Sequence, residues 1–301
     1  MEWLSEFGAI AAMQGFNGLS VFCVLLLMAL GLAIIFGQMG VINMAHGEFI
    51  MAGSYTAYVV QQGVSSAGAS LLISLVVGFV VGGLMGVLLE ATLIRRMYHR
   101  PLDTLLVTFG VGLVLQQLAR DIFGAPAVNV VAPSWLTGGV EILGAVVPKT
   151  RIFILVLAIV AVAVLSFALA KTSMGRRIRA VVQNRDLAET SGISSRRTDV
   201  TTFFIGSGLA GVAGVALTLI GSTSPTIGQS YLIDAFLVVV VGGLGQMKGA
   251  VIAAFALGIL NSFIEYSTTA SIAKVIVFVL IVIFLQVRPQ GLFVAKTRSL
   301  V

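Results

Sequence analysis

The sequence has few charged residues. Asp, Glu, Lys and Arg together occupy 10% of its 301 positions, whereas hydrophobic residues occupy 58%. Soluble domains carry about 25% charged residues, so this composition excludes an aqueous globular fold. The mean hydropathy of +1.07 agrees with that exclusion. We therefore expect a protein that lies mostly within lipid.

Cysteine and histidine are also scarce: Cys23 is the only cysteine, and His46 and His99 are the only histidines. A lone cysteine in an apolar run excludes internal disulfides and cysteine metal clusters. The sequence has no H-E-x-x-H pattern, no G-x-x-x-x-G-K-[ST] phosphate loop, and no serine or cysteine beside a plausible base. We therefore expect no metal, no cofactor, no catalytic residues and no ATP bound by this chain.

Basic residues are absent from the first third of the chain. None precedes Arg95, and all 18 follow from there. Because Lys and Arg concentrate in cytoplasmic loops, we expect an N-terminus outside the cytoplasm and a cytoplasmic C-terminus. This orientation places 14 of the 18 basic residues on the cytoplasmic side, in the stretches 95–103, 171–199, Lys248 and 288–301. Their distribution among short loops explains the net charge of +6 without nucleic-acid binding.

Apolar runs of about 18 residues or more, each able to cross roughly 30 Å of hydrocarbon, recur along the chain. The runs are continuous rather than alternating, and backbone in lipid must satisfy its own hydrogen bonds. The sequence therefore predicts an all-α, polytopic transmembrane helix bundle with eight or nine spans. Glycine-rich parts at 37–48 and 223–249 either cross or re-enter. The expected crossings are 19–37, 43–61, 69–94, 104–123, 151–170, 200–221, 231–247, 249–267 and 270–287.

We expect a single transmembrane domain over 1–301 with two notable loops. The loop 171–199 is polar and expected in the cytoplasm; the loop 124–150 contains three prolines and predicts an external loop with a short β-like or interfacial stretch. The tripeptide GQM occurs at 37–39 and again at 245–247, which hints at an internal repeat.

Small residues recur at four-residue spacing at Gly78, Gly82 and Gly86, and again at Ser207 and Gly211. Such faces let helices approach closely in membranes. We expect them to serve packing rather than chemistry.

Residues 37–48, GQMGVINMAHGE, place several polar side chains in an otherwise apolar half of the chain. Burying His and Glu in lipid is costly, so these groups should face the bundle interior and be paired, and the glycines permit a broken helix there. Three interpretations stay open: contact with a solute along a translocation route, bracing of a kink by His46 and Glu48, or an ordinary helix start at the cytoplasmic membrane boundary. The candidate pathway residues are Gln38, Asn43, His46, Glu48, Tyr55 and Gln116.

The segment from Arg176 to Arg197 contains six arginines and only two acids. Its apolar residues recur at roughly helical spacing, which predicts one short amphipathic helix parallel to the membrane, ended by Gly192 as a C′ residue. A solvated charged loop is the simpler interpretation. A helix that docks into a groove of a soluble subunit is favoured, because exposed apolar residues are not needed for solvation alone.

Charged residues near other span ends predict ion pairs. Asp234, Glu265 and Lys274 should lie toward the external ends of the last three spans, as a mutual ion pair or as a gate at the external mouth. Glu90 should pair with Arg95 or Arg96 at a cytoplasmic helix end.

Three segments resemble the branched-chain amino-acid permease family of ABC importers: GLAIIFGQMGVINMAHGEFIMAGSYTAY (31–58), VVQNRDLAETSGI (181–193) and FLVVVVGGLGQMKGAVIAAFALGILN (236–261). INMAHGE is a specific motif of that family. QNRD (183–186) and FLQVRPQGLF (284–293) look most like the urea-transporter permeases within it, the first of two membrane subunits.

The resemblance implies a bacterial inner-membrane protein that pairs with a second homologous permease, two ATPase subunits and an extracytoplasmic solute-binding protein. It also implies that a cytoplasmic loop with an acid–small–glycine pattern docks into the ATPase, although the chain lacks a tidy Glu-Ala-Ala run there. The docking residues that we expect are Arg176, Arg177, Asn184, Arg185, Asp186, Glu189, Gly192 and Ile193.

The expected function is therefore that of a permease subunit translocating urea or short-chain amides by alternating access. The alternatives are a branched-chain amino-acid permease and a self-sufficient channel or secondary carrier. A urea cavity needs hydrogen-bonding side chains. A leucine-type solute would need more apolar wall and a charged pair for its zwitterion.

Overall fold

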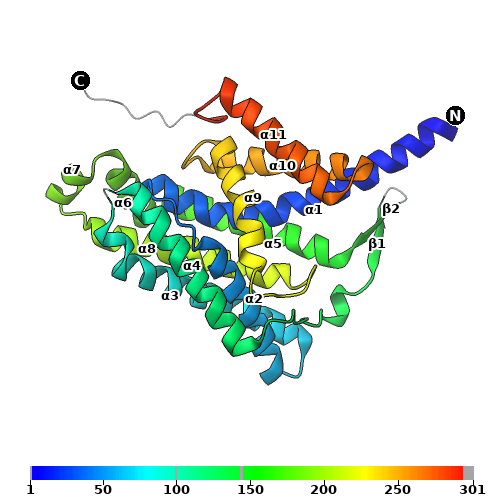
Figure 1. Cartoon of the computed structure of the whole chain (residues 1–301), viewed down its shortest axis with the longest axis horizontal. Helices are drawn as coiled ribbons and strands as arrows, with labels where there is room; N and C mark the ends of the chain where they lie inside the picture. The colour runs from blue at the N-terminus through cyan, green and yellow to red at the C-terminus, as the bar shows by residue number, and fades with distance from the viewer. Residues whose placement is uncertain (1, 99, 143–144, 294–301) are drawn as a thin grey trace.

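The computed structural model describes residues 2–98, 100–142 and 145–293. Nearly all of its regular structure is helical (Figure 1). The elements are α1 (Glu2–Met39), α2 (His46–Gly63), α3 (Ala67–Thr92), η1 (Ile94–Arg96), α4 (Pro101–Phe123), η2 (Ser134–Leu136), β1 (Gly139–Ile142), β2 (Ala145–Pro148), α5 (Lys149–Lys171), α6 (Ser173–Gln183), α7 (Arg185–Thr190), α8 (Ser195–Leu217), α9 (Ile227–Gly242), α10 (Met247–Ser267) and α11 (Ala270–Val287).

Within the described residues, seven helices are long and apolar enough to cross a membrane: α1, α3, α4, α5, α8, α10 and α11. Helix α9 is apolar but shorter, and the 18 residues of α2 begin with His46 and Glu48. The predicted all-α polytopic fold is confirmed. The predicted boundaries differ most at α1, whose helix extends well before residue 19.

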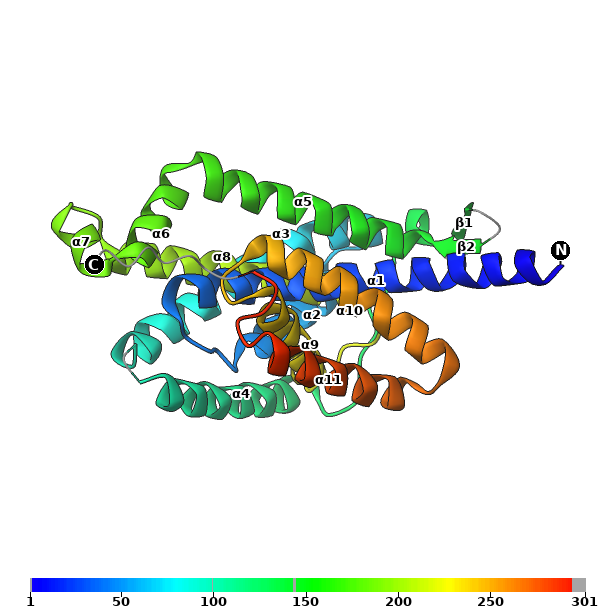
Figure 2. The same ribbon diagram turned by 90° about the horizontal axis from the view of Figure 1, so that it is seen from above.

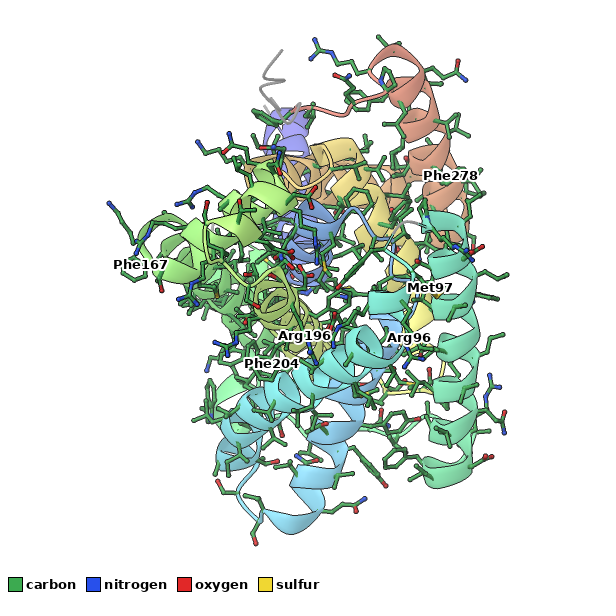
Figure 3. The ribbon with its side chains drawn as sticks, turned by 90° about the vertical axis from the view of Figure 1, so that its left-hand side faces the viewer. Arg96, Met97, Phe167, Arg196, Phe204 and Phe278 are labelled. Atoms are coloured by element: carbon green, nitrogen blue, oxygen red, sulfur yellow. The ribbon has the colours of Figure 1, made fainter. Side chains whose placement is uncertain are left out.

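Helices α1 and α8 form the centre of the bundle. In an apolar stretch of 18 residues from each of these two helices, 72% of the stretch is buried inside the molecule. The corresponding value is 17% for α5 and for α11. Helix α8 packs against α1, α2 and α3, while α10 packs along α1. The outer helices expose large apolar side chains, including Phe167 on α5 and Phe278 on α11 (Figure 3). Because such surface is stable only in lipid or against another protein, α5 and α11 lie at the periphery.

Close packing of α8 depends on small residues. A Cβ atom placed on Gly53 of α2 would lie 2.7 Å from the Cα of Gly211, and one on Gly78 of α3 would lie 2.8 Å from Val215. A Cβ on Gly82 would lie 2.5 Å from the backbone oxygen of Ser207. These contacts confirm the predicted small-residue packing faces.

We predict that Gly53→Val strongly destabilises the bundle, because its side chain would overlap the backbone of α8 rather than a flexible side-chain end. Gly63→Val is the matched control, since Gly63 lies on the same helix with nothing within 4 Å of an added Cβ. Thermal unfolding of the detergent-solubilised protein measures the difference. Equal melting temperatures for the two variants would contradict this packing.

The segments predicted to be cytoplasmic gather at one end of the molecule. Figure 2 shows α6 and α7, the α9–α10 turn and the end of α11 on the same side, opposite the β1–β2 hairpin. Leu292 donates a backbone hydrogen bond to Val241, which ties the segment after α11 to α9. If successive spans cross the membrane in alternating directions, as predicted, these segments must lie at the same end. Which end faces the cytoplasm stays a prediction. Residues 294–301 of the predicted tail lie outside the described residues.

The predicted external loop contains the expected β structure. Strands β1 and β2 form an antiparallel hairpin in which Val140 pairs with Val147. A separate bridge joins Val128 to Thr223, in the loop between α8 and α9. The bridge ties the start of this loop to the segment between α8 and α9.

The glycine-rich segment after α1 is broken as predicted. Helix α1 ends at Met39, Gly40 adopts a φ of +64°, and α2 begins at His46. The two GQM tripeptides meet there: a Cβ on Gly37 would lie 2.6 Å from the Cα of Gly245. An internal repeat remains a prediction, but this close approach requires glycine at both positions.

Candidate transport cavity and docking loop

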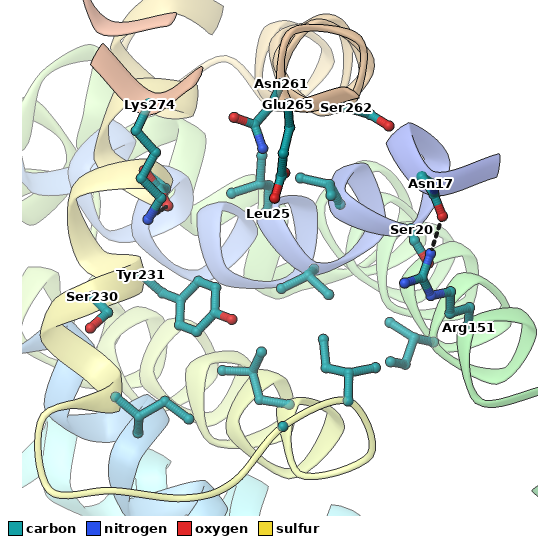
Figure 4. A pocket seen from close by; sticks show the side chains of 18 of the residues that line it. Asn17, Ser20, Leu25, Arg151, Ser230, Tyr231, Asn261, Ser262, Glu265 and Lys274 are labelled. Carbon is teal, nitrogen blue, oxygen red and sulfur yellow. Dashed lines mark hydrogen bonds and ion pairs between the residues drawn. The ribbon is translucent and has the colours of Figure 1, made fainter. Parts of the chain in front are cut away.

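A cavity of about 850 Å³ lies where α1 and α5 meet α9, α10 and α11. Figure 4 shows its lining from close by. The cavity is bounded by the middle of α1, the starts of α5, α9 and α11, the end of α10 and the loop after α8. Pockets that hold small molecules typically measure about 300–1,000 Å³. The cavity is therefore large enough for a small solute.

Hydroxyl, amide and charged groups line much of this cavity, and aliphatic side chains form another part of its wall. The aliphatic side chains come from four different helices and the loop after α8: Val21, Val24, Leu25, Ile154, Leu217, Ile220 and Ile227. Val24, Leu25, Ile154 and Leu217 are buried members of the hydrophobic core. The wall is therefore a fixed part of the bundle.

Two cations and two carboxylates also line the cavity: Arg151, Lys274, Asp234 and Glu265. Lys274 lies 3.4 Å from Asp234, so the ion pair predicted between them is confirmed. Arg151 donates a hydrogen bond to Asn17 at 2.5 Å. Among the described residues Glu265 has no ion-pair partner. Of the three residues predicted to pair with one another, Lys274 and Asp234 therefore form an ion pair, and Glu265 is separate from it.

Arg151 and Asn17 were not among the site residues predicted from the sequence. They are 134 positions apart, and no local motif joins them. The only available signal was that Arg151 is a basic residue on the expected external side, where few others occur.

The six predicted pathway residues lie elsewhere, in the interior of the bundle, and none lines the cavity. Gln38 donates to Asp199 at 2.9 Å and accepts a hydrogen bond from Thr202. Asn43 accepts from the backbone amide of Ala45 at 3.0 Å. These contacts match bracing of the broken segment, the second interpretation left open by the sequence.

The other four lie along α2 and α4. His46 Nε2 is 3.3 Å from the carbonyl oxygen of Met28. Glu48 accepts a hydrogen bond from Gln116 at 2.8 Å, and Tyr55 stacks on Phe123 with ring centroids 4.2 Å apart. The predicted pairing of Glu48 inside the bundle is thus confirmed.

Several of these groups retain buried polar atoms without a hydrogen-bond partner among the described residues: Asn43 Nδ2, His46 Nδ1, Glu48 Oε2 and Tyr55 Oη. An unsatisfied buried polar atom costs about 1–3 kcal/mol, and few are found in native structures. Four such atoms, one just before α2 and three along it, indicate that this region is not optimised for packing alone.

The docking segment differs from the single helix that we predicted. It contains two helices, α6 and α7, separated at Asn184. The Asn184 side chain accepts a hydrogen bond from the amide of Leu187 at 2.9 Å and so caps the start of α7, which ends the longer helix. Gly192 has a φ of +84° and follows α7, as predicted.

The surface of this loop is both charged and apolar. Ile178 and Val181 turn toward the bundle, whereas Leu187 is 63% exposed. The predicted docking residues on this surface are Arg176, Arg177, Asn184, Asp186, Glu189 and Gly192, with Ile193 half-buried. Glu189 also accepts a hydrogen bond from Ser195. Figure 3 looks at this end, where Arg196 lies at the start of α8 and Arg96 on η1.

Arg185, unlike the exposed docking residues, is directed toward the bundle. Its guanidinium pairs with Asp199, whose side chain is 1% exposed, and lies 5.0 Å from the ring centroid of Tyr98. Tyr98 donates to Glu90 at 2.7 Å, and Arg95 pairs with Glu90 at 2.6 Å, which confirms the predicted Glu90–Arg95 ion pair. Burial raises the pKa of the Tyr98 hydroxyl, which keeps it a donor. Arg185 therefore ties the loop to the bundle.

Comparison with known proteins agrees with this architecture. Residues 15–285 match the family described as branched-chain amino acid transport system / permease component. The permease LivH of Escherichia coli is 30% identical over 294 residues, which cover 93% of this chain and 94% of LivH. The permease BraD of Pseudomonas aeruginosa is 28% identical, covering 92% and 93%. The ribose import permease RbsC of Haemophilus influenzae is 32% identical over 40% of each chain. No solved structure matches the chain.

These findings define a multi-pass permease of the inner membrane rather than an enzyme. The chain belongs to the branched-chain amino acid ABC transporter permease family.

Proposed function

We propose that this chain is the permease subunit of an importer for branched-chain amino acids, working by alternating access. Its partners are a second homologous permease, two ATPase subunits and an extracytoplasmic solute-binding protein. The observation that carries the proposal is the cavity, which combines a wall of aliphatic side chains with groups of both charges. These are the two features that a leucine-type zwitterion requires.

The urea expectation finds less support than its stated alternative. The relatives named above are permeases of branched-chain amino acid transport systems. Urea is small, planar and uncharged, so the two cations and two carboxylates of the cavity would add no ion pair to its binding. The aliphatic side chains would also face a polar solute. A branched aliphatic side chain, in contrast, is stabilised by burial against Val24 and Leu25.

We propose further that the buried polar groups of α2 belong to a closed part of the same route. Ile227 lines the cavity and also packs in a cluster with Met51 and Tyr55. Moving α9 relative to α2 would thus open the cavity toward Glu48 and Gln116. The unpaired polar atoms there would then bind the solute's charged groups in passing.

Transport by the reconstituted complex tests the solute class. With the binding protein outside and ATP inside proteoliposomes, we expect uptake of labelled L-leucine, L-isoleucine and L-valine, each inhibited by the other two. A large excess of urea should leave leucine uptake unchanged. Uptake of urea together with exclusion of leucine would contradict the proposal.

We also predict that Gln116→Leu lowers leucine uptake about ten-fold at equal expression, because it removes the hydrogen bond to Glu48 and leaves that buried carboxylate without its partner. Gln117→Leu is the matched control on the next position of α4, where the side chain is exposed and donates a hydrogen bond to Asp121. Wild-type uptake by Gln116→Leu would remove this residue from the route.

A further inference from the structure

The charged groups that line the cavity match the charges of an amino acid. We propose that the cavity binds the zwitterion of an L-α-amino acid, with the carboxylate at Arg151 and the ammonium group at Glu265. The inference rests on the proposed function and deepens it, because it assigns a binding site to the membrane subunit itself rather than to the solute-binding protein alone.

Arg151 provides the carboxylate end of the site. It lies in the first turn of α5 and is half-buried, and the one hydrogen bond found for its guanidinium among the described residues is the 2.5 Å contact with Asn17. That contact uses one of its five N–H donors, so others stay available. A guanidinium whose orientation is fixed by a neutral amide is suited to bind a carboxylate through two parallel hydrogen bonds. Figure 4 shows Ser20 beside this pair, where its hydroxyl can add a further donor.

Glu265 provides the opposite charge. It lies near the end of α10, and Figure 4 shows its side chain extending toward the cavity above Leu25. Lys274, the other cation at the cavity, already pairs with Asp234. The pairing of those two leaves one cation and one carboxylate, Arg151 and Glu265, without an oppositely charged partner among the described residues.

This arrangement selects for a solute that carries both charges. The four charged groups sum to zero, so an amine without a carboxylate, or a carboxylate without an amine, would leave one of them unpaired. An unpaired charge in a partly desolvated site is penalised, whereas a zwitterion satisfies both ends. The charged groups would therefore discriminate by charge pattern, and the aliphatic side chains would discriminate by the solute's side chain.

The wall is placed to receive that side chain. Val21, Leu25 and Ile154 lie on α1 and α5, the two helices that also carry Asn17 and Arg151. A solute held at its carboxylate by Arg151 would thus lie beside the aliphatic surface of the same two helices. Burying a leucine-sized side chain there contributes about 1.5–3 kcal/mol of free energy to binding.

Photo-crosslinking of the purified importer complex in lipid nanodiscs tests this site. The probe is an L-leucine analogue with a diazirine in its side chain, and peptide mass spectrometry locates the adducts. We expect adducts on α1 and α5, at Val21, Leu25 or Ile154. Excess L-leucine should remove them, whereas 3-methylbutylamine, which lacks leucine's carboxylate, and 4-methylpentanoate, which lacks its ammonium group, should not.

Variants provide the second part of the test. Arg151→Met and Glu265→Gln should each reduce labelling about ten-fold or more, because each removes a charged hydrogen bond, and Arg151→Lys should retain part of it. Arg120→Met is the control: Arg120 is an exposed cation in the last turn of α4 and does not line the cavity. Each variant is compared at equal recovery of the intact complex.

The outcomes separate this inference from the proposed function. Adducts that form elsewhere, that the amine or the acid displaces as well as leucine does, or that persist in both Arg151→Met and Glu265→Gln would overturn the site even if the complex imports leucine. Failure of the wild-type complex to import leucine at all would instead overturn the proposed function.

Discussion

Replacing Arg185 by methionine is expected to destabilise the protein by about 3 kcal/mol or more, because it leaves Asp199 as an unpaired carboxylate in the bundle. Of the hydrogen bonds found among the described residues, Asp199 would keep the one from Gln38. The loss should appear as a fall of several degrees in the melting temperature of the detergent-solubilised chain. Arg176→Met is the control, since Arg176 is exposed on the same loop.

A second substitution should reverse most of this loss. In Arg185→Met/Asp199→Asn neither member of the pair is charged, and the asparagine can still accept the hydrogen bond from Gln38. Removing both charges of a buried pair is often nearly neutral. A double variant as unstable as Arg185→Met would show that the ion pair does not account for the effect.

The same ion pair should couple the loop to transport. Arg185 joins α7 to α8, and Asp199 joins α8 to the end of α1 through Gln38, so a displacement of α7 reaches the broken segment after α1. In the double variant we expect the ATPase subunits to remain bound, while the amount of leucine imported per ATP hydrolysed falls about ten-fold. An unchanged ratio would show that force passes by another route.

Replacing Leu187 by aspartate is expected to release the ATPase subunits from the complex. Leu187 is 63% exposed on α7, beside acids and arginines, and such an isolated apolar side chain is typical of an anchor that fills a pocket on a partner. Truncating an anchor costs about 2 kcal/mol or more, and a buried, unpaired carboxylate adds to this cost. Together they correspond to at least about a hundred-fold weaker binding.

Co-purification of the ATPase subunits with a tagged permease measures this effect. The matched control is Val131→Asp, which places the same charge at a site 67% exposed in the loop 124–150, at the opposite end of the bundle. Retention of the ATPase subunits by Leu187→Asp would remove α7 from the docking surface.

The properties that the sequence predicted well are those set by neighbouring residues. Continuous apolar runs specify helices in lipid, Gly192 ends α7 through its own backbone conformation, and Glu90 is only five positions from Arg95. Small residues at four-residue spacing marked the packing face of α3. Each of these signals is local, so the sequence carries it directly.

The missed features depend on contacts between distant residues. The predicted docking helix divides because the Asn184 side chain caps a new helix, a competition that helical periodicity does not reveal. Arg185 turns inward because Asp199, 14 positions away, is buried in α8. Arg151 and Asn17 meet only when α5 packs against α1. The cavity is therefore a property of the assembled bundle.

We propose that this chain moves amino acids only when partner ATPases supply energy through its loop. The most direct measurement is leucine uptake by proteoliposomes that contain either this chain with its partner permease or the full complex, with and without ATP. We predict that leucine accumulates only in the full complex with hydrolysable ATP. Equilibration of leucine through the permeases alone, without nucleotide, would contradict the account.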